Sequence, residues 1–275
     1  MNTYQKHCRW GQFLLIHGDM ISEFVNLYGE WCEGEVELFR QLLPEDGVVV
    51  EVGSNIGMHS IPMSQFCDRG KVFCFEPQRI VFQILCANIA LNNRLNVFAR
   101  QCAVGGTEET IDIQSGDYDR PWNYGAFSLT SGFSAEMKYT GAARMEKVGV
   151  VVLDQDPGLK DIGRLDFLKI DAEGFETFVL RGAREIIGRF RPFIFIENNA
   201  EKNFDSVLSA VRALGYQCYW YCSARHRPNN YNGAFWKLEG FDMNMLCVPD
   251  GKSSPLELVP VSGFHDLREK QIPLY

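Results

Sequence analysis

Long apolar runs and a surplus of positive charge are both missing from this sequence. No stretch of about 18 uninterrupted apolar residues occurs among its 275 residues, so we expect no membrane-spanning helix. Residues 1–7 lack the apolar core and small-residue cleavage site of a signal peptide, which favours a cytoplasmic location. The formal net charge is −8, whereas nucleic-acid binding depends largely on clustered Lys and Arg. We therefore expect neither a membrane nor a nucleic acid as a partner.

Paired cysteines are also lacking. The nine cysteines are an odd number and none stands in a Cys-x-x-Cys pair, which argues against a disulfide framework and against a zinc site. Cys74, Cys102, Cys218 and Cys247 fall inside apolar, strand-like runs. Buried free thiols explain this placement best, and no metal is expected on this ground.

What the sequence does contain, from about residue 47 to 215, is an alternation of short β-rich runs with longer helical runs. We expect strands over 48–52, 71–75, 96–99, 165–170 and 192–196, and helices over 57–67, 79–91, 175–188 and 205–214. Strands this apolar are buried on both faces, as in a parallel sheet covered by helices. The alternation predicts a doubly wound α/β domain whose ligand lies beyond the carboxyl ends of the strands.

Other regions do not follow the alternation. Residues 1–46 are expected to form a mostly helical lead-in, and residues 104–150, rich in Gly, Ser and Thr, a loop or small β insertion. Two further strand-like runs, Tyr216–Cys222 and Asn244–Val248, complete a domain over 47–250, and 251–275 forms an irregular C-terminal tail. No linker indicates a second domain.

The most specific motif is Glu51-Val52-Gly53-Ser54-Asn55-Ile56-Gly57, between the first strand and the first helix. A Gly directly after a strand allows a tight turn and close approach of a ligand, and a helix start presents free N–H groups. Dinucleotide-binding folds use Gly-x-Gly-x-x-Gly here, with the pyrophosphate on the helix. The spacing Gly-x-x-x-Gly and the acidic Glu51 instead favour S-adenosylmethionine, which has a cationic amino acid end and no phosphate.

A second acidic residue strengthens this interpretation. Glu76 ends the second strand in Phe75-Glu76-Pro77, about twenty residues after the loop. A carboxylate at this point can accept hydrogen bonds from both ribose hydroxyls of a nucleotide. The competing interpretation is a solvated carboxylate at the start of the next helix, which Pro77 helps to begin.

Together these motifs resemble one family. The segments that carry the resemblance are 51–57, Phe-Glu-Pro-Gln (75–78), Asn88 with Asn92, Ala-Val-Gly (103–105) and Leu-Lys-Ile-Asp-Ala-Glu-Gly-Phe-Glu (168–176). They are similar to the FkbM methyltransferases, over about residues 28–248. The resemblance implies a Rossmann-like class I methyltransferase fold with a mostly parallel seven-stranded sheet and helices on both faces. It also implies methylation of hydroxyl groups on sugars, polyketides or other secondary metabolites, or in some members of peptide amide nitrogens.

Site residues carry over by position. The resemblance assigns the methionine end and backbone of the cofactor to Glu51, Gly53, Ser54, Asn55 and Gly57. It assigns the ribose to Glu76, beside Pro77, and the adenine to Cys102 and Ala103. Tyr28 and Glu35 lie in a segment that resembles the lead-in helix closing over the cofactor, and Asp171 and His59 complete the expected cofactor contacts. Met58-His59 departs from the family pattern, in which a small or aromatic residue is followed by Thr.

Methyl transfer to a hydroxyl needs close alignment and benefits from a base. The candidates are Asp171, Glu173 and Glu197, at the carboxyl ends of the fourth and fifth strands. Asp171 can instead cap the following helix, and Glu173 can be a first-turn acid that complements the helix dipole. An Asp after one strand and an acidic-Asn pair after the next is also similar to the Mg²⁺ site of catechol-type O-methyltransferases.

The acceptor is expected to contact the variable segments, including the 104–150 insertion. Segments 122–127 and 225–232 combine aromatic rings with amides, which suits a carbohydrate or another polyhydroxylated small molecule. The candidate contacts are Asn123, Tyr124, His226 and Asn230, although ordinary polar loops have the same composition. Two alternatives remain open, a peptide amide N-methyltransferase and a nucleotide-binding protein of Rossmann type without methyl transfer. A nucleic-acid methyltransferase is disfavoured, because no Asn/Asp-Pro-Pro-Tyr motif follows the fourth strand.

Overall fold

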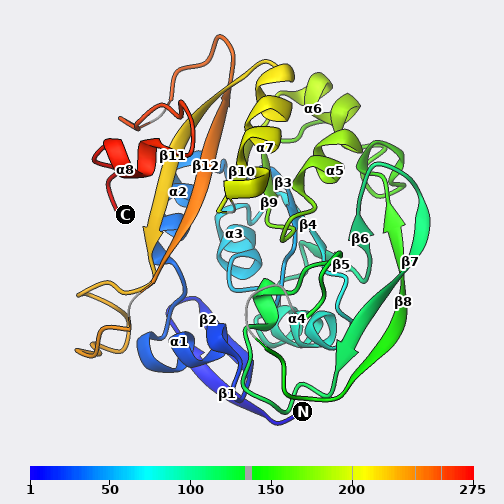
Figure 1. The fold of residues 1–275 in the computed structure, drawn as a ribbon, viewed down its shortest axis with the longest axis vertical. Helices are drawn as coiled ribbons and strands as arrows, with labels where there is room; N and C mark the ends of the chain where they lie inside the picture. The colour runs from blue at the N-terminus through cyan, green and yellow to red at the C-terminus, as the bar shows by residue number, and fades with distance from the viewer. Residues whose placement is uncertain (134–137, 200, 239, 255) are drawn as a thin grey trace.

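A computed structural model describes residues 1–133, 138–199, 201–238, 240–254 and 256–275. Its centre is a seven-stranded sheet in the order β11-β12-β10-β9-β3-β4-β5 (Figure 1). The parallel strands are β3 (Val48–Val52), β4 (Lys71–Phe75), β5 (Val97–Arg100), β9 (Phe167–Ile170) and β10 (Phe193–Glu197). β12 (Phe241–Pro249) runs antiparallel to both β10 and β11 (Tyr216–Ala224). The predicted α/β fold with a mostly parallel seven-stranded sheet is confirmed.

Helices cover both faces of this sheet (Figure 1). Successive side chains of a strand point to opposite faces, and all five residues of β3 are buried. Val50 packs in one core cluster with α5 (Glu176–Arg181), α6 (Arg184–Phe190) and α7 (Glu201–Ala213). Val49 packs in another with α2 (Glu33–Leu42), α3 (Ser60–Phe66) and α4 (Arg79–Leu91). The uninterrupted Val run is therefore the signature of a strand between two helical layers.

The chain order creates a crevice at the centre of the sheet. From β3 the chain moves outward to β4 and β5, and then returns to β9, on the other side of β3. Gly53 follows β3 and Asp171 follows β9, so both lie where the two directions diverge. Ligands of open α/β sheets bind at such a switch point.

The helical lead-in was predicted wrongly for the first sixteen residues. β1 (Thr3–Cys8) and β2 (Gly11–Ile16) form an antiparallel hairpin, and helix begins only with α1 (Met20–Tyr28). Alternation was the missed signal, because Phe13 and Leu15 are buried while Gln12 is exposed. The hairpin is fixed on α4 by Asn88, whose amide bonds the backbone N–H and carbonyl of Leu14.

The predicted small β insertion is present, although its residues 134–137 lie outside the described chain. β6 (Ala103–Val104), β7 (Glu109–Gly116) and β8 (Ala143–Val151) form a three-stranded sheet in the order β6-β8-β7. Between β7 and β8 lies the short 3₁₀ helix η1 (Tyr124–Ala126). Aromatic residues of this segment, such as Trp122 and Phe133, share a core cluster with Phe13 of the hairpin. Insertion and hairpin therefore pack as one layer over the crevice.

Several boundaries differ from the sequence prediction. α3 begins at Ser60, so the loop after β3 is three residues longer than expected. The helix expected over 175–188 is divided into α5 and α6, because Asp154 accepts hydrogen bonds from the Glu185 and Ile186 N–H groups and starts α6 there. The C-terminal tail carries the short helix α8 (Asp266–Glu269) and packs on β11, with Tyr275 stacked on Tyr221.

The composition led to two predictions, one about the cysteine side chains and one about membrane-spanning helices. Eight of the nine cysteines are buried, and Cys86 is half-buried, as expected for apolar thiols. Among the described helices, none combines the length and the apolar character needed to cross a bilayer.

Candidate active site

The loop after β3 is shaped by Gly53. Its φ of 79° lies in the left-handed region, and an added Cβ would collide with the Asp171 carbonyl oxygen. The missing side chain lets the end of β3 approach the end of β9 directly. The Gly53 and Ser54 N–H groups donate to the Phe75 carbonyl, at 2.9 and 3.2 Å, which fixes the loop against β4 as well.

Glu76 joins this loop to the next helix. Its carboxylate accepts hydrogen bonds from the Asn55 N–H, at 3.0 Å, and from the Gln78 N–H, at 2.8 Å. The side chain is buried, and this burial raises the pKa of Glu76 to about 7, although the two N–H donors oppose the shift. Each carboxylate oxygen keeps a lone pair for a further donor, such as a ribose hydroxyl.

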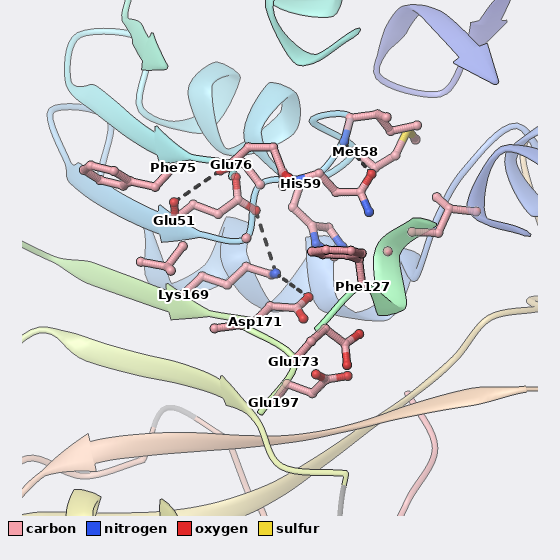
Figure 2. Close-up of a pocket in the computed structure, with 18 of the residues that line it drawn as sticks. Glu51, Met58, His59, Phe75, Glu76, Phe127, Lys169, Asp171, Glu173 and Glu197 are labelled. Carbon is pink, nitrogen blue, oxygen red and sulfur yellow. Dashed lines mark hydrogen bonds and ion pairs between the residues drawn. The ribbon is translucent and has the colours of Figure 1, made fainter. Parts of the chain in front are cut away.

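A buried cation connects the first and fourth strands of the domain. The Lys169 ammonium on β9 lies 3.0 Å from Asp171 Oδ2 and 3.8 Å from Glu51 Oε1, and Figure 2 shows it reaching toward Asp171. Burial disfavours a charged lysine, but Asp171, Glu51 and Glu35 outweigh it and hold the pKa of Lys169 above its usual range. The Ser60 hydroxyl also donates to Glu51.

Three carboxylates gather where β9 and β10 end. One oxygen each from Asp171, Glu173 and Glu197 lie within 4.8 Å of one another (Figure 2). Burial and the neighbouring carboxylates of Glu173 and Asp171 raise the pKa of Glu197 well above its usual range. Asn199 donates to Glu197 at 2.7 Å. Such a group can accept a proton, and its hard oxygen atoms are also of the type that binds Mg²⁺.

A fourth polar group lines the crevice from the side of α2 and α3. His59 is buried, and its Nε2 lacks a hydrogen-bond partner within the described part of the chain. This nitrogen lies 3.6 Å from Glu35 Oε2, while the Asn244 amide donates to the other oxygen of Glu35 at 2.9 Å. Burial lowers the pKa of His59, so the imidazole is neutral and free to bond a ligand.

These groups surround one pocket. The predicted site residues that line it are Glu35, Glu51, Gly53, Ser54, Asn55, His59, Glu76, Pro77, Cys102, Ala103, Asn123, Asp171, Glu173 and Glu197. Its outer wall comes from the lead-in and the insertion, through side chains such as Ile21, Trp31 and Phe127. The sheet therefore supplies the charged floor, and the two additions supply an apolar cover.

Five residues predicted for the site do not line this pocket. Tyr28 and Asn230 are buried and hold the loop between β11 and β12, and the His226 ring packs on Tyr28. The Tyr124 hydroxyl donates to the Arg120 carbonyl instead of facing the crevice. Gly57 turns the loop against α4, where a Cβ would lie 2.8 Å from a methyl of Leu85. Direct contact of these five with a ligand is therefore not supported.

Other pocket residues were missed. Lys169 and Gln78 lie inside motifs that had been recognised, so spacing from Asp171 and Glu76 could have indicated them. Asp242 and Asn244 come from β12, and no local pattern marks them. Arg225 directly follows β11 and begins the predicted acceptor segment 225–232, but it was not among the residues named from that segment.

Comparison with known proteins decides the family. The description "Methyltransferase FkbM domain" matches residues 51–218, more than half of the chain. The chain belongs to the FkbM methyltransferase family. Its domain is accordingly that of an S-adenosylmethionine-dependent methyltransferase, with the class I fold expected from the resemblance.

Individual FkbM relatives are distant. Methyltransferase sdnD of Sordaria araneosa is 29% identical over 163 residues, which are 52% of this chain and 62% of the relative. This chain thus spans about three fifths of that relative's length. The 2-O-methyltransferase NoeI of Sinorhizobium fredii is 24% identical over 176 residues, 62% of this chain and 70% of the relative. The crystal structure of a methyltransferase FkbM from Methylobacillus flagellatus has 17% identity and a TM-score of 0.44, covering 75% and 47% of the two chains.

Proposed function

We propose that this FkbM methyltransferase transfers a methyl group to a hydroxyl oxygen of a small molecule, such as a sugar, a polyketide or another secondary metabolite. The observation that carries the proposal is the carboxylate group of Asp171, Glu173 and Glu197 on the floor of the pocket, next to the loop of Gly53. An aliphatic hydroxyl is a weak nucleophile. A carboxylate within hydrogen-bond distance makes the oxygen more nucleophilic by accepting its proton.

The residues around the loop fit the cofactor. The bare backbone at Gly53 admits a close ligand, the remaining lone pairs of Glu76 suit ribose hydroxyls, and His59 offers an unbonded ring nitrogen. Cys102 and Ala103 border the same pocket and suit the adenine. Glu51 is already balanced by Lys169 and Ser60, so we assign it to fixing the floor of the cofactor site.

In the proposed reaction the cofactor supplies the methyl group, and the protein supplies the alignment of the acceptor and the group that accepts its proton. Bound S-adenosylmethionine supplies a methyl group on a positively charged sulfur that an oxygen nucleophile can displace. The protein holds the acceptor hydroxyl in line, which removes entropy from the barrier. Glu197 accepts the hydroxyl proton as the new C–O bond forms, and the Lys169 ammonium keeps Asp171 oriented beside it.

The acceptor class is supported by the pocket wall. Trp31 and Phe127 offer aromatic surfaces, and Asn123 and Asn244 offer amides, a combination that suits a polyhydroxylated molecule. The name of the relative NoeI, a 2-O-methyltransferase, points in the same direction.

The test is an acceptor screen read by mass spectrometry. The protein is incubated with S-adenosylmethionine and matched acceptors that carry either free hydroxyls or peptide amides, and products are sought that gain one methyl group. We expect products from hydroxylated acceptors, which lose activity when the hydroxyl is replaced by hydrogen. Methylation confined to amide nitrogens would contradict the proposal. So would calorimetry that shows NAD binding without S-adenosylmethionine binding.

A further inference from the structure

The pocket has far more negative than positive groups. Among its described residues only Lys169 and Arg225 are cationic, whereas seven carry carboxylates: Glu35, Glu51, Glu76, Asp171, Glu173, Glu197 and Asp242. S-adenosylmethionine carries a positive sulfur, an ammonium and a carboxylate, so it adds one net positive charge. The chain and the cofactor together therefore leave an excess of negative charge, which is costly in a buried site.

Both cations already compensate particular carboxylates. Lys169 Nζ lies 3.0 Å from Asp171 Oδ2 and 3.8 Å from Glu51 Oε1. Arg225 Nε donates a hydrogen bond to Asp242 at 3.0 Å. The excess charge therefore remains after these ion pairs are taken into account.

Glu35 and Glu197 have no such cation beside them. Within the described ranges, no Lys or Arg nitrogen lies within 4.0 Å of either carboxylate. Burial is the largest cause that raises the pKa of both groups well above the usual range, and at Glu35 it outweighs the opposing charge of Lys169. A cationic ligand would supply the charge that these two carboxylates lack.

Both carboxylates lie at the end of the pocket away from the proposed cofactor loop. Gly53 follows β3, whereas Glu197 ends β10, two strands further along the sheet. Glu35 accepts a hydrogen bond from Asn244 on β12, the strand beyond β10. Glu197 and Asn244 are direct cross-strand partners, so their side chains leave the same face of the sheet. Adjacent strands are about 4.8 Å apart, so β10 and β12 lie about 10–14 Å from β3.

His59 is a second, independent indication of a ligand at this end. It is 7% exposed, and its Nε2 has no hydrogen bond to the part of the chain that the structure describes. Nε2 lies 3.6 Å from Glu35 Oε2, which is too far for a hydrogen bond. Burial lowers the pKa of His59 and keeps the ring neutral, so this nitrogen can accept a hydrogen bond. A group that bonds both His59 and Glu35 is best matched by a positively charged N–H donor.

We propose that the acceptor carries an ammonium group beside the hydroxyl that is methylated, as an amino sugar or an amino alcohol does. The ammonium binds at Glu35 and His59, and the hydroxyl lies at Glu197. This inference rests on the proposed function, because it names the class of acceptor for the same site. It makes neutral sugars and neutral polyketides the poorer acceptors.

The ammonium takes no part in bond making. The oxygen–carbon bond forms as the sulfur–carbon bond of the cofactor breaks, and the hydroxyl proton moves to Glu197. A protonated nitrogen has no lone pair, so the hydroxyl oxygen is the nucleophile. The positive charge of the acceptor also favours the ionised form of Glu197, which is the form that accepts the proton.

Matched acceptors test for the ammonium. Glucosamine, N-acetylglucosamine and glucose form one set, and 2-aminocyclohexanol, its N-acetyl derivative and cyclohexane-1,2-diol form a second. Calorimetry measures the binding of each to the full chain saturated with S-adenosylhomocysteine, so the preference is measured whether or not a methyl group is transferred. We expect the free amine to bind at least ~tenfold more tightly than both neutral forms, because these lack the charged hydrogen bond to a buried carboxylate. Mass spectrometry should locate the transferred methyl group on oxygen.

Glu35→Gln should lose most of the preference for the amine, because the amide has no charge. Glu33→Gln is the matched control. Glu33 is buried in the same helix α2, but it bonds Trp10 and is not among the described residues that line the pocket. This variant should keep the preference. The ratio between amine and neutral acceptor does not depend on the fraction of folded protein, and the wild-type comparison needs no variant.

Equal binding of the three forms by the wild type, or a preference retained in Glu35→Gln, would overturn the inference. Oxygen methylation of neutral acceptors without any preference for the amine would do so too, and would leave the proposed O-methylation intact. Transfer of the methyl group to the amine nitrogen, with the binding preference present, would instead contradict the hydroxyl as the methylated group.

Discussion

The Lys169 ammonium lies 3.0 Å from the Asp171 carboxylate and 3.8 Å from that of Glu51, and so joins the carboxyl ends of β9 and β3 through one buried cation. Glu51 lies on β3, two residues before Gly53 of the proposed cofactor loop, and Asp171 belongs to the group of carboxylates proposed to act on the acceptor. Lys169 is 3% exposed, so its charge is screened little by water.

Lys169→Met removes the cation from the buried Glu51 carboxylate and from the partly exposed Asp171 carboxylate. Breaking a buried ion pair on one side typically costs about 3–5 kcal/mol, so the free energy of unfolding should fall by that order. Lys147→Met is the control, because its pair with Asp112 is exposed and surface pairs contribute about 1 kcal/mol or less. Chemical denaturation of both variants measures the difference, and equal losses would show that the buried pair has no special role.

Gly53→Ala should damage both the fold and the cofactor site. A side chain there adopts an unfavourable left-handed φ, costing about 1–2 kcal/mol, and also meets the Asp171 carbonyl. Gly188→Ala, inside α6 with open space around it, should instead stabilise by about 0.5–1 kcal/mol. Thermal unfolding measures both effects, as a lower melting temperature for Gly53→Ala and a higher one for Gly188→Ala. Calorimetry should show weaker S-adenosylmethionine binding for Gly53→Ala alone, and unchanged affinity there would refute the loop assignment.

Glu76 should make cofactor affinity depend on pH. Burial raises the pKa of Glu76 to about 7, and the ionised form is the stronger acceptor for ribose hydroxyls. Affinity for S-adenosylmethionine should therefore rise as the pH increases from about 6 to 8, as the carboxylate loses its proton. Glu76→Gln should bind at least ~tenfold more weakly at the upper end and lack this rise.

Glu33→Gln provides the control for that experiment. Burial raises the pKa of Glu33 to about 7 as well, but its carboxylate bonds Trp10 rather than lining the pocket. The variant should keep the pH-dependent rise in affinity. Loss of the rise in Glu33→Gln, or its survival in Glu76→Gln, would contradict the ribose assignment.

Glu197→Gln should lower turnover and leave cofactor affinity unchanged. General base catalysis commonly contributes about 10²–10⁴-fold, so a loss in that range is expected, and Asp171→Asn should also be impaired. Burial, together with the neighbouring carboxylates, raises the pKa of Glu197 well above its usual range, so wild-type turnover should increase with pH as Glu197 loses its proton. Glu201→Gln, at the exposed start of α7, is the control. Normal turnover in both Glu197→Gln and Asp171→Asn would remove them from the mechanism.

Chelation tests whether the carboxylates of Asp171, Glu173 and Glu197 bind Mg²⁺ instead of acting on the acceptor proton. Lys169 already provides a cation beside Asp171, so extensive treatment with EDTA should leave turnover unchanged. A loss of activity that Mg²⁺ restores would assign Asp171, Glu173 and Glu197 to a metal site instead.

Local sequence patterns determined the central part of this fold. The Val run of β3, the helical spacing over residues 79–91 and the alternation of the two element types are short-range signals, and the strand and helix positions agree with them to within a few residues. The loop of Gly53 and the acidic Glu76 were predictable for the same reason, since a turn after a strand needs its own residue types at fixed spacing. These patterns therefore predicted two features, the proposed cofactor loop after the first strand and the carboxylates at the ends of the fourth and fifth strands.

Tertiary packing decided what the patterns left open. The strands of residues 3–16 had a local signal in their alternation, but their packing on Asn88 of α4 and on the aromatic residues of the insertion had none. The Tyr28 hydroxyl bonds the Trp236 carbonyl in the loop between β11 and β12, more than 200 residues away, and does not line the pocket. The Asn244 amide donates to Glu35 across a similar separation in sequence. Such contacts depend on which surfaces meet after the sheet has formed, so local spacing carried no signal for them, whereas the β3 turn was determined by its own residues.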